Sequence, residues 1–124
     1  MIVRTCLLIS DDPDDHAEFS EALYEISDDI ILMTVSDVKK AIDLLLYKKC
    51  FPEYVFFNVG MSDFTPDEFV SAIHADTSLA NISVIAYGEN IQPLSTGTSR
   101  ITRFLTDGLS FSEFKRELKK VLAN

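Results

Sequence analysis

The fold of this chain is decided by residues 54–69, which read Tyr54-Val55-Phe56-Phe57-Asn58-Val59-Gly60-Met61-Ser62-Asp63-Phe64-Thr65-Pro66-Asp67-Glu68-Phe69. The first five residues form an apolar run of strand length that ends on a polar side chain, Asn58. Thr65 and Glu68 have the spacing of a capping box, and Pro66 suits the first turn of a helix. The stretch therefore predicts a buried strand, a short loop and a helix.

Four more apolar runs of strand length flank this stretch, at residues 2–9, 30–35, 82–87 and 101–106. Each is followed by signals for a helix, although residues 89–98 contain Pro93 and Gly97 and predict only a short or irregular one. The other helices are expected to begin near Pro13, after Ser36-Asp37 and after Ser110. The helix after Ser36-Asp37 is expected to close at Lys48-Lys49-Cys50. Five strands alternating with helices predict an α/β fold, in which a parallel sheet is covered on both faces.

Composition places the chain among ordinary globular proteins. It has 124 residues, 47% hydrophobic residues and a mean hydropathy of +0.12, which predict a single domain spanning residues 1–124. No apolar run approaches the length of a membrane helix and no signal peptide is evident, so a cytoplasmic location is expected. The net charge of −9 argues against nucleic acid as a partner. Cys6 and Cys50 do not suggest a disulfide framework. His16 and His74 stand alone at helical positions and are expected to be surface or satisfied histidines.

The polar residues that follow the predicted strands should meet at one edge of the sheet, where open α/β proteins place their sites. They are Ser10, Asp11, Asp12, Asn58, Gly60, Gly88 and Asp107. Of the acids, Asp12 is expected to cap the first helix rather than to face the site, and Asp14 and Asp15 to interact with the helix dipole. Asp63 lies in the loop beyond Asn58 and is interpreted as a turn residue.

With these elements in order, the whole chain resembles the receiver domain of bacterial response regulators, of the single-domain chemotaxis type. The motifs that carry the resemblance are Leu7-Leu8-Ile9-Ser10-Asp11-Asp12-Pro13-Asp14-Asp15, the strand ending at Asn58, Val84-Ile85-Ala86-Tyr87-Gly88 and Phe104-Leu105-Thr106-Asp107-Gly108. The resemblance implies a flavodoxin-like three-layer sandwich whose five parallel strands have the order 2-1-3-4-5. It also implies a part in two-component signal transduction.

The residues at the family's phosphorylation site do not fit its chemistry. The resemblance places Asn58 at the phosphoacceptor aspartate, Gly88 at a hydroxyl residue and Asp107 at a lysine. A carboxamide is no nucleophile for phosphoryl transfer, and the carboxylate of Asp107 would repel the anion that a lysine attracts. We therefore expect a degenerate pseudo-receiver that is not phosphorylated.

Cation binding should weaken with the loss of these groups. The resemblance implies a Mg²⁺ site, for which this sequence offers the carboxylates of Asp11 and Asp12 and the backbone carbonyl of Gly60. Hard cations favour several charged oxygens, so Mg²⁺ is expected to bind weakly if at all. No other cofactor is expected.

The leading hypothesis is a phosphorylation-independent protein-binding module of a signalling pathway, and not an enzyme. The resemblance implies that residues 89–98, the strand at 101–106 and the last helix form a surface for partners or a homodimer. Phe104 stands at the family's switch aromatic, and without a phosphoryl group we expect it to hold one state.

Two alternatives belong to other classes. Asp11, Asp12 and Asp107 could form an acidic pocket above Asn58 that senses a cation or another ligand, although solvated surface acids are the simpler interpretation. An enzymatic reading rests on Ser95-Thr96-Gly97-Thr98, which is slightly similar to a flavodoxin phosphate loop. That loop belongs after the first strand, where this chain is acidic, so the reading has little support.

Overall fold

The computed structural model describes residues 3–47, 50–61, 65–88, 101–105 and 109–122, and the strand at 101–105 by its backbone alone. The elements in chain order are β1 (Arg4–Ile9), α1 (Pro13–Ile26), β2 (Ile30–Val35), α2 (Val38–Leu46), β3 (Tyr54–Asn58), α3 (Pro66–His74), the 3₁₀ turn η1 (Thr77–Leu79), β4 (Ser83–Gly88), β5 (Ile101–Leu105) and α4 (Phe111–Leu122). Strands and helices alternate as the hydrophobic pattern predicts.

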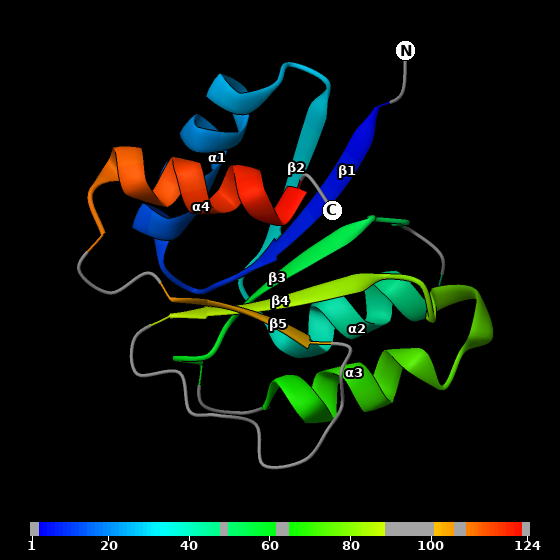
Figure 1. Ribbon diagram of the computed structural model, residues 1–124. Coiled ribbons are helices and arrows are strands. Elements are labelled where there is room, and N and C mark those ends of the chain that lie inside the picture. The colour runs from blue at the N-terminus through cyan, green and yellow to red at the C-terminus, as the bar shows by residue number, and fades with distance from the viewer. Residues whose placement is uncertain (1–2, 48–49, 62–64, 89–100, 106–108, 123–124) are drawn as a thin grey trace.

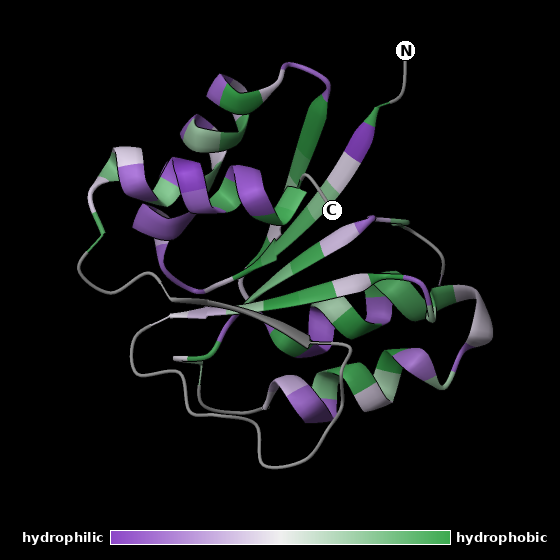
Figure 2. Cartoon of the chain, viewed as in Figure 1, coloured by the Kyte–Doolittle hydropathy of each residue, from purple (hydrophilic) through white to green (hydrophobic). Residues whose placement is uncertain are grey.

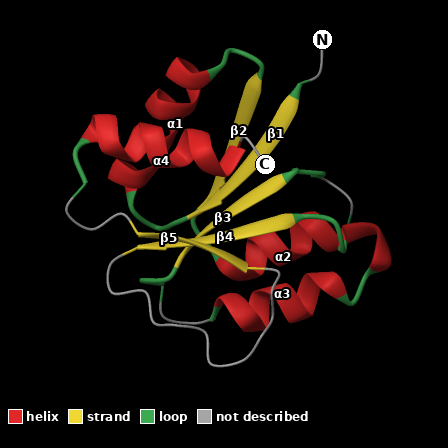
Figure 3. Cartoon of the chain, viewed as in Figure 1, coloured by secondary structure: helices red, strands yellow, loops and turns green. Residues whose placement is uncertain are grey.

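The strands form one parallel sheet in the order β2-β1-β3-β4-β5. The predicted α/β architecture and the order of β1 to β4 are confirmed, and the backbone of β5 pairs with β4. Helices α1 and α4 lie on one face of the sheet and α2 and α3 on the other (Figures 1 and 3). The result is a three-layer arrangement in which the central strands are covered on both faces.

Two apolar clusters fill the space between these layers. Phe57, Phe69 and their neighbours pack under α2 and α3, whereas Phe19, Phe56 and Phe114 belong to the cluster under α1 and α4. Successive residues of a strand point to opposite faces, which explains why Phe56 and Phe57 enter different clusters. Figure 2 shows the same division, with apolar strands inside and polar residues on the outer helix faces.

The helix starts follow the predicted capping chemistry. Asp12 accepts a hydrogen bond from the backbone N–H of Asp14, and Asp37 accepts one from Lys39. Thr65 and Glu68 form a reciprocal capping box at α3. Ser110 and Glu113 do the same at α4, where hydrogen bonds to Ser110 lower the pKa of the Glu113 carboxyl.

The structure corrects one predicted boundary and adds one element. The second helix was expected to end at Lys48, Lys49 and Cys50, but α2 ends at Leu46 because Tyr47 leaves the helical conformation. The turn η1 was not predicted, although Asp76 caps it. Both cysteines are free and buried, and burial raises the pKa of the Cys6 thiol to about 12.

Candidate functional site

Polar residues meet at the carboxyl ends of three neighbouring strands. Ser10 follows β1 and is completely buried, and Asn58 is the half-buried last residue of β3. The register of β3 and β4 pairs Asn58 with Tyr87, so Gly88 ends β4 beside them. The predicted convergence of Ser10, Asn58 and Gly88 at this edge is therefore observed.

The side chain of Asn58 is held at both ends of its amide. Its Nδ2 donates to Ser10 Oγ at 3.1 Å and to Asp15 Oδ2 at 3.3 Å. Its Oδ1 accepts from the backbone N–H of Gly60 at 2.8 Å. A carboxylate at this position would keep the contact with Gly60 but could not donate to Ser10 or Asp15.

Asp15, in the first turn of α1, is the centre of the hydrogen-bond network. Its Oδ2 accepts bonds from Ser10 Oγ at 2.8 Å and from Tyr87 Oη at 2.7 Å, besides the one from Asn58. Ser10 Oγ also accepts from the backbone N–H of Asp12 at 3.1 Å, which uses the full capacity of its hydroxyl. We call Ser10, Asp15, Asn58 and Tyr87 the polar cluster.

Tyr87 connects the polar cluster to the hydrophobic core. Its ring packs on Phe19 with centroids 4.9 Å apart, and its hydroxyl reaches Asp15, one helical turn before Phe19. Residues four apart lie on the same side of a helix, so one face of α1 receives both parts of the tyrosine. Burial raises the pKa of Tyr87 above its usual value, and the hydrogen bond to Asp15 raises it further. The phenol therefore remains a protonated donor.

The two glycines at this edge fit closely around Asn58 and its neighbour. Gly88 has a φ of +138°, and a Cβ there would lie 2.8 Å from Val59 Cγ2. A Cβ on Gly60 would lie 3.1 Å from Asn58 Oδ1. The backbone at Gly88 thus disfavours a hydroxyl residue, which the sequence resemblance implies at this position.

The charge around the polar cluster is negative. Asp14 and Asp15 occupy the first turn of α1, and Asp11 and Asp12 directly precede it. The pKa of the Glu18 carboxyl is raised by partial burial and then by the charges of Asp15 and Asp14. An approaching phosphate would meet this field before it met Asn58.

The residues expected at the cation site do not fit a magnesium ion. Asp11 is exposed, and Asp12 is committed to capping α1. The carboxylate that does enter the site, Asp15, already accepts three hydrogen bonds on one oxygen. Within the ranges that the structure describes, no three His, Cys, Asp or Glu residues are grouped so as to hold a metal.

The remaining sequence predictions divide into three groups. Asp107 and Asp63, together with the segment 89–98, lie outside the described residues, as does the side chain of Phe104. His16 was expected on the surface or satisfied, and its Nε2 donates to the backbone carbonyl of Ser10 at 2.7 Å. Asp11 was expected at the site, but it is exposed and the polar cluster does not include it.

Sequence reasoning missed two members of the polar cluster. Asp15 was assigned to the helix dipole, and Tyr87 was treated as an ordinary strand residue. The position of Asp15 in the sequence was a signal that it faces the sheet. It lies four residues before Phe19 and so stands at the start of the apolar stripe of α1. An acid at the head of a buried stripe needs hydrogen-bond donors, and Tyr87 is one of them.

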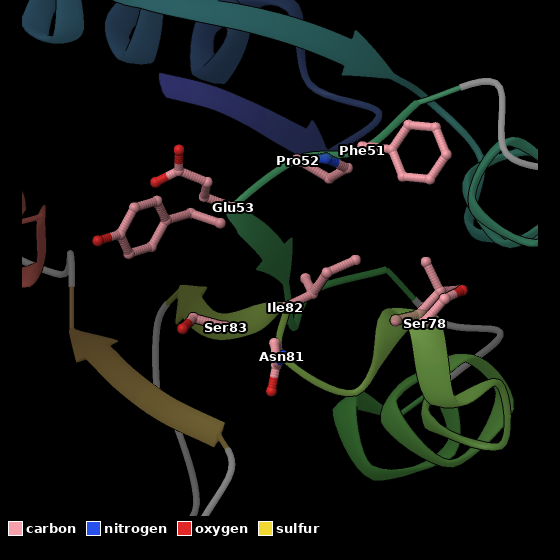
Figure 4. A pocket seen from close by; sticks show the side chains of 9 residues that line it. Phe51, Pro52, Glu53, Ser78, Asn81, Ile82 and Ser83 are labelled. Atoms are coloured by element: carbon pink, nitrogen blue, oxygen red, sulfur yellow. The ribbon is translucent and has the colours of Figure 1, made fainter. Parts of the chain in front are cut away.

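A surface hollow lies at the other end of the strands. Its volume is about 340 Å³, and its lining includes Phe51, Glu53, Ser78, Ile82 and Ser83. In Figure 4, Phe51 and Ser78 lie on one side, Glu53 and Ser83 on the other, and Ile82 between them. These residues belong to the amino ends of β3 and β4 and to η1, so the hollow is separate from the polar cluster.

The sheet order, the two pairs of helices and the polar edge together define the chemotaxis-type receiver fold, an α/β fold. Among the described residues, no helix has the length and apolarity to cross a membrane.

Solved structures of response regulators are similar to this chain at low sequence identity. Chemotaxis response regulator CheY4 of Vibrio cholerae has 18% identity and a TM-score of 0.75, with 96% of this chain and 98% of that chain covered. A two-component response regulator from Legionella pneumophila has 17% identity and a TM-score of 0.78, with 98% and 99% covered. A response regulator from Hahella chejuensis has 14% identity and a TM-score of 0.79, with 97% and 92% covered.

The sequence itself gives no such match. No protein-family model matches the chain, and no curated protein is similar to it in sequence. The likeness therefore concerns the fold, and the function has to be argued from the residues of the site.

Proposed function

We propose that this chain is a receiver-fold signalling module that binds protein partners without being phosphorylated. The observation that carries the proposal is the bonding of Asn58, whose amide donates to Ser10 and Asp15 and accepts from Gly60. A residue bound in this way offers no nucleophilic carboxylate, and its amide cannot form a stable acyl phosphate.

Asp15 supports the same conclusion. Its carboxylate lies 3.3 Å from Asn58 Nδ2 and supplies negative charge at the place where a phosphoryl group would have to enter. Two unit charges about 4 Å apart repel by about 4 kcal/mol at an effective dielectric of 20. The carboxylate of Asp15 accepts hydrogen bonds from Ser10, Asn58 and Tyr87, so the polar cluster favours one conformation over a change driven by a ligand.

The fold supports the signalling role only by analogy, because the similar solved structures are response regulators. A module of this kind acts by presenting surfaces to partners, so we propose no substrate turnover. The sequence resemblance directs attention to the last helix and the strand before it as one such surface. The cation-sensing alternative gains no support, since Asp11 and Asp12 do not join Asn58.

The test is incubation of the purified chain with a small phosphodonor and Mg²⁺, followed by intact-mass measurement. We expect no added phosphoryl group under conditions that phosphorylate a receiver with an intact acceptor aspartate. A stoichiometric mass increase of one phosphoryl group would overturn the proposal, and peptide mapping would then identify the acceptor.

A further inference from the structure

The strand β2 occupies one edge of the sheet, and in the described part of the chain it pairs only with β1. An edge strand presents an outer row of backbone N–H and C=O groups that can pair with another strand. Proteins usually protect such edges with charged side chains, proline or bulges. β2 reads Ile30-Ile31-Leu32-Met33-Thr34-Val35 and contains no charge, no proline and no glycine.

The side chains of β2 also leave apolar surface uncovered. Helices α1 and α2 contact β2 from the two faces, yet Ile31 remains 52% exposed. An exposed strand edge that carries an uncovered apolar side chain favours a protein partner over solvent.

The charges on either side of β2 indicate how a partner strand would run. Asp28 and Asp29 precede the strand, and the lysines Lys39 and Lys40 follow it in the first turn of α2. Asp37 also follows β2, but its carboxylate accepts the backbone N–H of Lys39 at 2.8 Å as the α2 cap. The connection that precedes β2 is therefore acidic, and the first turn of α2, which follows β2, carries two lysines.

A second copy of this chain matches that pattern when its β2 runs antiparallel. The acidic residues before one strand then lie beside the lysines after the other strand. Two-fold symmetry repeats this pairing at the opposite end of the interface. A parallel arrangement would place like charges together at both ends. We propose that β2 is a self-association edge, through which two copies form one continuous sheet across a two-fold axis.

This edge is distinct from the surface that the family resemblance indicates. β2 and β5 lie at opposite ends of the sheet order, so dimers formed through them would place different residues in contact. Pairing through β2 would leave the polar cluster and α4 accessible to other partners. The proposal does not depend on whether Asn58 can be phosphorylated.

The first experiment measures the mass of the intact chain by sedimentation over a wide range of concentrations. We expect a reversible dimer that Ile31→Lys and Thr34→Lys each weaken by about tenfold or more, because each places a charge at the pairing edge. Phe51→Lys is the matched control, since Phe51 is 62% exposed and lines the hollow at β3, β4 and η1 instead of the β2 edge. Circular dichroism at low concentration verifies that each variant is folded.

The second experiment tests the direction of pairing by exchanging charges. Lys39→Glu with Lys40→Glu should weaken the dimer by about tenfold, and adding Asp28→Lys to that variant should recover part of the loss. Arg116→Glu with Lys120→Glu changes the net charge equally on the exposed side of α4, and it should leave the dimer intact. Slower amide exchange in β2 at high concentration is expected in the wild-type chain.

Three results would overturn the proposal. The chain could stay monomeric at the highest concentration, or its dimer could be unaffected by both lysine substitutions in β2. A dimer that the α4 charge changes weaken, and that the α2 changes do not, would place the interface on α4 instead. Failure of Asp28→Lys to recover any affinity would exclude the antiparallel pairing.

Discussion

At the carboxyl ends of β1, β3 and β4, polar side chains are buried or half-buried and bonded to one another, whereas β2 carries mainly apolar side chains beside an outer row of backbone groups. The polar cluster satisfies its donors and acceptors within the chain. In the described part of the chain, β2 uses only one of its two edges. A region that is internally satisfied has little free energy to gain from a ligand, while an unsatisfied edge gains hydrogen bonds and buried apolar surface on pairing.

The comparison shows that the place where a fold usually carries its chemistry need not be the place where a given chain interacts. A receiver fold positions its loops at the carboxyl edge of the sheet. Here the residues at that edge favour each other over an external anion. Substitutions in the polar cluster should therefore change stability, and substitutions along β2 should change association.

Asp15→Ala should have the largest effect on stability. It removes the acceptor that Ser10, Asn58 and Tyr87 share, and we expect the free energy of unfolding to fall by about 3 kcal/mol. Urea denaturation measures the change. Asp14→Ala is the matched control, because the exposed Asp14 is the preceding residue in the same turn and should change stability by about 0.5 kcal/mol or less. Equal effects of the two substitutions would refute the central place of Asp15.

Asn58→Asp should destabilise the chain by about 2 kcal/mol at neutral pH, because the new carboxylate would lie beside that of Asp15. Like charges raise the pKa of such a pair in the folded state. Stability relative to the wild type should therefore be restored at acid pH and lost as the pH rises through that pKa. Denaturation at several pH values measures the trend, and a pH-independent difference would contradict it.

The same variant also tests the chemistry of the site. With Ser10, Gly88 and Asp15 unchanged, Asn58→Asp should remain unphosphorylated by a small phosphodonor with Mg²⁺. The measurement is again intact mass. Phosphorylation of the introduced carboxylate would mean that the amide alone had disabled the site.

Gly88→Ser should cost about 2 kcal/mol, since a side chain at φ +138° is strained and its Cβ would approach Val59. Gly60→Ala is the matched control. Its Cβ would lie 3.1 Å from the side-chain oxygen of Asn58, so a small shift of that side chain should relieve it and the loss should be smaller. Thermal and urea unfolding of both variants provide the comparison, and a larger loss at Gly60 would contradict the assignment of strain to Gly88.

Tyr87→Phe should cost about 1 kcal/mol, because it removes one hydrogen bond to Asp15 and keeps the ring against Phe19. Tyr24→Phe removes an exposed hydroxyl and should change nothing measurable. A loss above about 3 kcal/mol would show that the hydroxyl organises the whole polar cluster and not one bond within it.

Ile31→Lys should have the smallest effect on the monomer, within about 0.5 kcal/mol, because Ile31 is half exposed. Denaturation at low concentration measures it. Together with the expected loss of dimer, this result would separate association from stability. If Ile31→Lys destabilised the monomer as strongly as Asp15→Ala does, β2 would be needed for folding. The substitution could then not separate association from stability.

The sequence was sufficient for the elements and for their capping. Runs such as residues 54–57 are apolar throughout because a central parallel strand is buried on both faces. Thr65 with Glu68 and Asp12 with Pro13 mark helix starts through local hydrogen bonds, which neighbouring residues determine. The end of α2 was less predictable, because the residues after Leu46 carry no strong stop signal before Pro52.

The candidate site was predictable only in part. The positions of Ser10, Asn58 and Gly88 followed from where the strands end, and the exposed Asp11 did not join them. Nothing local indicates that Asp15 turns inward while Asp14 stays outside. That difference depends on which side of α1 faces the sheet and on the donors that arrive from other strands.

By itself the sequence determined the α/β alternation, the apolar strands, the capped helices and an amide in place of the acid at Asn58, because each of these depends on composition or on residues close in the chain. Only the tertiary structure decided that Asp15 and Tyr87, 72 residues apart, bond to each other. It also decided that β2 is the strand left at the edge. Both outcomes depend on packing α1 against the sheet and on the crossover order of the strands, which no local pattern encodes.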